Sequence, residues 1–234
     1  MRHLELSPRL RLLAGWVRPG AQVADVGTDH AYLPVWLVLH GRVSSAIASD
    51  LREGPLARAR ETGRTYGAES VDFRLCGGLS GIRPDEADTI VIAGIGGENI
   101  AAILAGAPWT ADGAHTLLLQ PQTRAEVLRQ FLSEHGYRIT QEALVRDRGI
   151  LYPCMEVTAG QETLSPGQLY GGAKLLRDPL GEQYIIAKII RLQSAVAGLN
   201  RAGGPEDQEK ADALREILTA LLSMREEWRH ANCP

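Results

Sequence analysis

The chain has 234 residues, a formal net charge of -3, a hydrophobic share of 44% and a charged share of 23%. This composition is ordinary for a soluble globular protein, and the length allows a real core in one large domain or in a domain with an appendage. The small net charge provides no overall attraction to nucleic acid, so any basic surface has to be local.

The three cysteines, Cys76, Cys154 and Cys233, form no CxxC pair. This argues against a disulfide framework or a zinc site built from cysteines. The N-terminal residues have no apolar run of signal-peptide length, and no stretch of the sequence reaches the roughly 18–20 apolar residues of a membrane span. We therefore expect no metal and a reducing, cytoplasmic environment.

A helix opens the chain, and alternating strands and helices follow it. Ser7 can cap the first helix and Pro8 suits its first turn. The arginines of this helix, Arg9 and Arg11 among them, are interpreted as a solvated face, with an RNA-contacting face as the alternative. Strands are predicted at 22–26, 44–49, 70–75, 89–93 and 115–119, and helices at 31–39, 54–66, 98–105 and, with Thr123 as cap, up to 135.

The order of these elements predicts the fold class. Five βα units indicate an α/β protein with a mostly parallel, doubly wound sheet and right-handed crossovers. Two more strands, at 138–145 and 151–158, have no helix between them and so form an antiparallel pair. Such a pair at the edge of a Rossmann-like sheet is typical of class I methyltransferases, although a fold by itself does not decide function.

After residue 160 the character of the sequence changes. The stretch from Leu164 to Gly172 reads as a connector, and two runs with heptad spacing follow it. They predict an antiparallel helical hairpin of the coiled-coil type, which serves either as a packing or dimerisation arm or as a substrate arm. We divide the chain into a Rossmann-like domain at 1–160 and a helical domain at 161–234. The apolar seams are Ile185, Ile189, Leu192, Val196 and Leu199, and Leu214, Ile217, Leu221, Met224 and Trp228.

Polar and glycine-rich loops follow every predicted parallel strand, and these loops open on one edge of the sheet. Asp50 ends the second strand about twenty residues after the first glycine turn, where a carboxylate can accept hydrogen bonds from both ribose hydroxyls of an adenosine group. The alternative for Asp50 is a helix cap. Gln120 and Gln122 flank Pro121 after the fifth strand, and their amides can read a purine edge unless they are only loop residues.

The turn after the first strand departs from the dinucleotide-binding fingerprint. Asp29 and His30 stand where that fingerprint has glycines, and a carboxylate there repels a pyrophosphate. The same carboxylate suits a ligand that carries a sulfonium and an ammonium group. The turn therefore favours S-adenosylmethionine over NAD(P), with a simple helix cap as the alternative for Asp29 and a structural role for His30.

At these loops the sequence resembles the bacterial tRNA (adenine-22-N1)-methyltransferase family. The match spans about residues 4–158, and the C-terminal helices resemble the coiled-coil domain of the family in pattern only. The run from Asp25 to Pro34 is the most specific motif. The matching stretches are LELSPRL at 4–10, ADVGTDHAYLP at 24–34, AIASD at 46–50, Gly54-Pro55, IVIAGIGG at 90–97 and LLLQP at 117–121.

The resemblance implies a Rossmann-like methyltransferase domain, S-adenosyl-L-methionine as cofactor, tRNA as partner and N1 of an adenine as the acceptor. We predict no obligate protein partner. The resemblance assigns the ribose contact to Asp50, and we predict Asp29, Tyr32 and Gln122 as the catalytic residues. The donor pocket is expected to contain Asp25, Gly27, Thr28, Asp29, His30, Asp50, Leu51, Gly78, Leu79, Ala93, Gly94 and Gly96.

Two positions depart from the family pattern. Gly77 replaces an aspartate that would face the adenine amino group of the donor, and Gln122 replaces an asparagine. One lost hydrogen bond to a neutral group costs on the order of 1 kcal/mol. These departures support one alternative, a catalytically weak or silent RNA-binding protein on a methyltransferase fold. A dinucleotide-dependent enzyme is the second alternative, and Asp29 and the absent glycines of the first turn disfavour it.

Overall fold

The computed structural model describes residues 4–232, and seven strands form one sheet in the order β3-β2-β1-β4-β5-β7-β6. The parallel strands β1 to β5 are followed by an antiparallel pair, in which β7 lies beside β5. This arrangement confirms the predicted fold class. The bounds are β1 Val23–Val26, β2 Ala46–Asp50, β3 Val71–Leu75, β4 Thr89–Ile95, β5 Thr116–Pro121, β6 Tyr137–Asp147 and β7 Ile150–Ala159.

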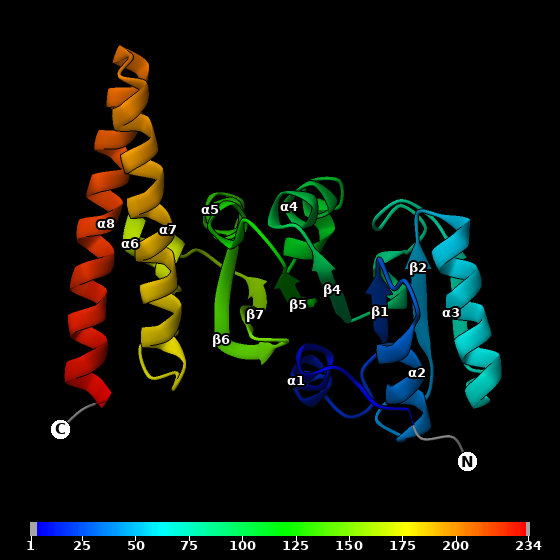
Figure 1. Cartoon of the computed structure of the whole chain (residues 1–234). Helices are drawn as coiled ribbons and strands as arrows, with labels where there is room; N and C mark the ends of the chain where they lie inside the picture. The colour runs from blue at the N-terminus through cyan, green and yellow to red at the C-terminus, as the bar shows by residue number, and fades with distance from the viewer. Residues whose placement is uncertain (1–3, 233–234) are drawn as a thin grey trace.

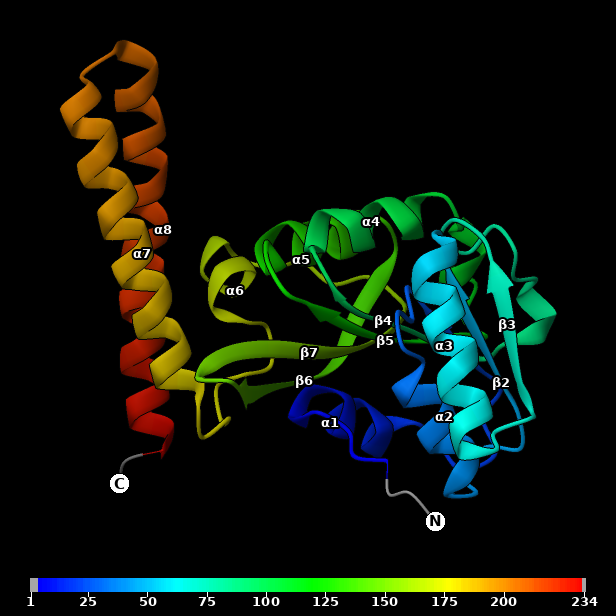
Figure 2. The ribbon, with the colours of Figure 1, turned by 45° about the vertical axis from the view of Figure 1, so that its right-hand side comes forward.

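Helices cover both faces of the sheet (Figures 1 and 2). One layer contains α4 (Gly97–Ala105) and α5 (Ala125–Glu134), and the other contains α1 (Pro8–Trp16), α2 (Tyr32–Leu39) and α3 (Glu53–Tyr66). Alternate residues of β4 pack on opposite layers, with Ile90 and Ile92 against the first and Val91 against the second. Both faces are therefore apolar, which is why the central strands read as continuous hydrophobic runs.

Two loop predictions differ from the structure. Strand β4 continues through Gly94 and Ile95 with an irregular register, and β5 includes Gln120 and Pro121. The predicted cap Thr123 is wrong because α5 begins one residue later, after Arg124, whose backbone is left-handed with φ 54°. The strands thus run further toward the functional edge than the glycines and the proline suggested.

The C-terminal part forms the predicted helical hairpin, with α7 (Gly181–Ala202) and α8 (Pro205–Asn232) side by side (Figure 1). The expectation of a plain connector at 164–172 is wrong. A short helix, α6 (Pro166–Gly171), lies there, and Ser165 and Gln168 form its capping box. Strand β7 ends at Ala159, close to the predicted boundary at 160, and the division into two domains stays a prediction.

A buried ion pair joins the sheet to the segment that leads into the hairpin. Both oxygens of Glu142 on β6 are engaged: Oε1 accepts from Arg129 Nε and Nη2 at 2.9 and 2.6 Å, and Oε2 accepts from the amides of Ala173 and Lys174. The Nη1 of Arg129 donates to the carbonyl of Leu169 at 2.7 Å. Both charged side chains are fully buried, so the helical part is fixed to the sheet edge at this junction.

Candidate functional site

A cleft of about 440 Å³ opens at the carboxyl edge of the sheet. Its walls come from α1, from the turn after β1, from the ends of β4 and β5, and from the turn between β6 and β7. Nine of the predicted site residues meet here although they are spread over about a hundred positions in the sequence. They are Asp25, Gly27, Thr28, Asp29, His30, Tyr32, Ala93, Gly94 and Gln122.

The turn after β1 is held against the end of β2. The amides of Gly27 and Thr28 both donate to the carbonyl of Ser49 at 2.9 Å, and Gly27 has a left-handed backbone with φ 74°. The Thr28 hydroxyl donates to the carboxylate of Asp25. Burial raises the pKa of Asp25 to about 6, the Thr28 bond opposes the shift, and the neighbouring charge of Asp50 adds to it. The base of the cleft therefore contains a carboxyl group whose ionised form would be stabilised by a positively charged ligand.

Asp29 lies in the same turn and does not cap α2. The cap position belongs to Ala31, which makes no side-chain bond to the helix, so the helix-cap alternative for Asp29 is wrong. Asp29 and Ala31 both have positive φ, 49° and 54°, which is uncommon outside glycine. Asp29 accepts from Arg58 Nη2 at 2.6 Å, and half of its side chain remains exposed. This strained turn presents a carboxylate to the cleft.

An aromatic pair follows this carboxylate. The rings of His30 and Tyr32 stack with centroids 5.1 Å apart. Tyr32 is 39% exposed and lines the cleft, so it is not a core residue. A flat, accessible ring beside a carboxylate is suited to stacking with a planar base.

Asp50 lies outside the lining of this cleft, on the neighbouring strand end. Asp50 does not cap α3, because the cap position is occupied by Arg52, whose side chain makes no capping bond. Instead, Oδ1 of Asp50 accepts from the Arg52 backbone amide at 2.9 Å. The helix-cap alternative is therefore wrong. Asp50 is nearly buried, and next to it the large apolar side chain of Leu51 is 71% exposed.

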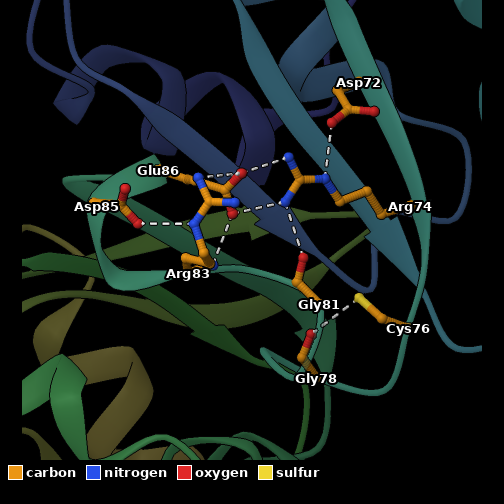
Figure 3. Close-up of polar contacts among 8 residues, drawn as sticks. All are labelled: Asp72, Arg74, Cys76, Gly78, Gly81, Arg83, Asp85 and Glu86. Carbon is orange, nitrogen blue, oxygen red and sulfur yellow. Dashed lines mark hydrogen bonds and ion pairs between the residues drawn. The ribbon is translucent and has the colours of Figure 1, made fainter.

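The loop after β3 carries Gly78 and Leu79, which also lie outside the cleft lining. Figure 3 shows that Arg74 holds this loop, because its Nη1 donates to the Gly81 carbonyl at 2.9 Å and its guanidinium pairs with Glu86. Bonds from Arg74 hold the pKa of Glu86 well below its usual range. The loop is thus fixed at its base by a charged network and is joined to β2 through the Cys76 amide and the Asp50 carbonyl.

The ends of β4 and β5 are bonded to each other. The backbone N–H of Gln122 donates to the Ile95 carbonyl, and the backbone N–H of Gly97 donates to the Thr123 carbonyl, both at 2.8 Å. A β-carbon on Gly97 would lie 2.3 Å from the Arg124 carbonyl oxygen, so only glycine fits this close approach. The predicted residue Gly96 stays at the start of α4, outside the cleft, where it occupies the cap position.

Comparisons with known proteins agree with this geometry. Residues 6–155 match a methyltransferase domain family. A curated tRNA (adenine(22)-N(1))-methyltransferase of Bacillus subtilis is 36% identical over 179 residues, which are 73% of this chain and 75% of that protein. The chain belongs to the tRNA (adenine(22)-N1)-methyltransferase family.

Solved structures support the same conclusion over nearly the whole chain. The B. subtilis M1A22 tRNA methyltransferase has a TM-score of 0.87 and 30% identity, and the match covers 95% of this chain and 100% of that chain. A Streptococcus pneumoniae protein in complex with S-adenosyl-L-methionine has a TM-score of 0.82 and 33% identity, with 94% and 100% covered. The C-terminal hairpin therefore belongs to the shared architecture of this methyltransferase family.

In this family member, sequence reasoning missed two arginines of the cleft. Arg9 of α1 was interpreted as part of a solvated face, which is wrong, because its guanidinium is bonded to Gln120 and Asp147. Arg148 lines the cleft from the turn between β6 and β7 and has φ 49°. The Arg148-Gly149 pair is a hairpin signal that could have placed this turn, whereas nothing local to Arg9 indicates its distant partners.

Among residues 4–232, no helix is long and apolar enough to cross a membrane.

Proposed function

We propose that this protein transfers the methyl group of S-adenosylmethionine to N1 of an adenine in tRNA, at the position that corresponds to adenine 22 in its relatives. The observation that supports this proposal is a group of carboxylates at the ends of β1 and β2, within a fold shared with the tRNA methyltransferases. Asp25 and Asp29 line the cleft, and Asp50 lies outside its lining but close enough for its charge to raise the pKa of Asp25. Cationic ligands gain from such a cluster and pyrophosphates do not.

The residues present fit the cofactor. Asp50 is proposed to hold the ribose hydroxyls: its Oδ1 accepts from the Arg52 backbone amide, and among residues 4–232 no donor is bonded to its Oδ2. Leu51 and Leu75, 71% and 53% exposed at the ends of β2 and β3, provide apolar surface for the purine, and Gly78 and Leu79 lie in the adjoining loop. Asp25, Gly27, Thr28 and His30, with Ala93, Gly94 and Gly96 across the edge, are proposed to surround the methionine end.

S-adenosylmethionine supplies a methyl group activated by a sulfonium, so the chemistry demands little of the protein beyond position and electrostatics. Adenine N1 has a lone pair in the ring plane and needs no general base before it attacks. The adenine becomes cationic as N1 is methylated, and the half-exposed carboxylate of Asp29 stabilises that charge. Tyr32 offers a stacking surface for the base, and Gln122 an amide for its edge.

A second groove adjoins the cleft and extends toward the hairpin. It is about 420 Å³ in volume, shares Gln122 with the cleft, and lies between the end of β5 and helix α7. Its cationic side chains are suited to RNA phosphates, which supports the substrate-arm interpretation over a simple packing arm. They are Arg124, Arg146, Lys188 and Arg191.

The test is methylation of bulk bacterial tRNA with labelled S-adenosylmethionine, followed by mapping of the site where reverse transcription stops. A stop at a D-arm adenine supports the proposal, and a transcript with guanine at that position is the control. Donor binding without methylation would indicate the silent RNA-binding alternative. Binding of NADH in a titration would indicate the dinucleotide-dependent alternative.

The groove is tested in the same assay by charge reversal. Arg191→Glu is expected to raise the KM for tRNA and to leave the affinity for the donor unchanged. Lys210→Glu, near the start of α8 and outside the groove, is the matched control. An equal KM for the two variants would contradict the substrate-arm role.

Because the proposed substrate is tRNA, we also propose that the enzyme acts in the cytoplasm and without an obligate protein partner. Cys76 and Cys154 are free thiols, in keeping with a reducing compartment. Cys233 lies outside the described residues.

A further inference from the structure

Helix α1 forms one wall of the cleft, and one of its arginines is directed inward. Arg9 is only partly exposed, with a side-chain accessibility of 22%, whereas Arg11 of the same helix is exposed. The guanidinium of Arg9 lies 4.8 Å from the ring centroid of Tyr152 on β7. This packing fixes the plane of the guanidinium, which is a rigid fork of donors.

The first acceptor of this fork is Gln120. Arg9 Nη1 donates to the Gln120 Oε1 at 3.0 Å, and the Gln120 Nε2 donates to the carbonyl of Pro121 at 2.9 Å. Gln120 is 1% exposed, so both ends of its amide depend on these partners. Arg9 thereby determines how the Gln120 amide is oriented and, through it, where the Pro121 carbonyl points, one residue before Gln122 in the cleft.

The second acceptor is Asp147, the last residue of β6. Arg9 Nε donates to Asp147 Oδ2 at 2.7 Å, and the Asp147 side chain is 10% exposed. Asp147 pairs with Ile150 across the two-residue turn Arg148-Gly149, in which both residues have positive φ, 49° and 83°. Arg9 thus also anchors the turn that places Arg148 at the cleft.

We propose that Arg9 is a positioning residue for methyl transfer, because one guanidinium fixes both the β5 end that carries Gln122 and the β6–β7 turn that carries Arg148. The inference rests on the proposed function. It does not require that Arg9 touch the donor, since the donor is assigned to the ends of β1, β2, β3 and β4, whereas the partners of Arg9 lie on β5 and β6. Errors in the placement of an acceptor base affect the rate of the chemical step more than donor binding.

The test compares Arg9→Ala, Arg9→Lys and Arg11→Ala in the full-length protein. For Arg9→Ala we expect kcat of tRNA methylation to fall about 10- to 100-fold, with the donor Kd from calorimetry within about twofold of wild type. Lysine is a point donor that serves one acceptor and not both, so Arg9→Lys is expected to recover part of kcat. Arg11→Ala, on the exposed side of the same helix, is expected to match the wild type.

Three outcomes would overturn the inference. The first is an unchanged kcat in a folded Arg9→Ala protein. The second is a loss of donor affinity in step with kcat, which would place Arg9 in the donor pocket or in general stability. The third is a wild-type kcat in Arg9→Lys, which would show that the second acceptor of the guanidinium is not needed. This variant decides the question if Arg9→Ala does not fold. A wild-type protein that binds donor and methylates no tRNA would instead refute the proposed function itself.

Discussion

Two regions contain a buried carboxyl group: the junction between the sheet and the hairpin, and the cleft at the sheet edge. They differ in how completely that group is paired with donors. In the junction, the two oxygens of Glu142 accept four N–H groups, two of them from Arg129. In the cleft, Asp25 has a hydroxyl partner and a carboxylate neighbour, and its pKa is raised to about 6. The junction is electrostatically complete, whereas the cleft leaves charge for a cationic ligand to neutralise.

The largest effect is expected where the completed junction is broken. Glu142→Ala leaves the guanidinium of Arg129 buried without its anionic partner, and removal of one partner of a buried pair costs about 3–5 kcal/mol. The free energy of unfolding, measured by urea denaturation, is expected to fall by that amount. Glu134→Ala, an exposed residue at the end of α5, is the control and is expected to change it by less than about 0.5 kcal/mol. A loss below about 1 kcal/mol for Glu142→Ala would show that the pair is not a structural requirement.

The next effect concerns the donor and leaves the fold intact. Asp50→Ala removes the carboxylate assigned to both ribose hydroxyls, and hydrogen bonds to a charged group are worth about 1.5–3 kcal/mol each. The affinity for S-adenosylmethionine is therefore expected to fall about 100-fold or more in calorimetry. The exposed carboxylate variant Glu69→Ala is the matched control. Unchanged affinity in Asp50→Ala would remove the ribose assignment.

Local patterns were enough to predict most of the sheet, but not the contacts that complete it. The apolar runs and glycine turns predicted the strands and helices of a doubly wound sheet, because hydrophobic periodicity and turn chemistry are local properties. Helix α6 was not predicted because its glycines and its proline are typical of a connector. Its capping box nevertheless stabilises a short helix there. The partners of Arg9 lie 111 and 138 positions away, and no local signal encodes such a contact.

The candidate site shows the same limit. Its loops could be placed at one edge because parallel strands share their carboxyl ends. Whether Asp29 and Asp50 were helix caps could not be decided from sequence, since aspartate at a helix start is favourable in either role. The observed cap positions, Ala31 and Arg52, exclude that alternative for both residues.

A smaller effect is expected from pH. The folded protein binds a proton at Asp25 as the pH falls through about 6, whereas an unperturbed aspartate does so near about 3.9. This group therefore favours the folded state less as the pH rises from about 4 to 6. A cationic donor prefers the ionised carboxylate, so its affinity is expected to rise about tenfold between about pH 5 and 7.

Calorimetry over that pH range checks this expectation. Asp25→Asn is expected to bind the donor more weakly at neutral pH and with a flat pH profile. His30→Gln tests the neighbouring imidazole and is expected to retain the slope. A wild-type affinity that does not change with pH would show that Asp25 does not face the positive charge of the donor.

The smallest expected effect is an increase in the affinity for the donor, caused by a substitution in the loop after β3. Gly77 stands where the family pattern has an aspartate toward the adenine amino group, and its φ is not in the left-handed region. A β-carbon at Gly77 would meet only Leu51 Cδ1, at 3.4 Å, so a side chain is tolerated. Gly77→Asp is therefore expected to add one hydrogen bond, about 1 kcal/mol, and to tighten donor binding about fivefold.

Gly77→Ala separates the added hydrogen bond from the lower backbone entropy that any side chain confers on the unfolded loop. We expect the alanine variant to bind the donor as the wild type does, and only the aspartate variant to bind it more tightly. Equal affinities in all three proteins would mean that the adenine does not lie over the β3 loop. The exposed side chains of Leu51 and Leu75 would then need another explanation, because they are assigned to the same purine.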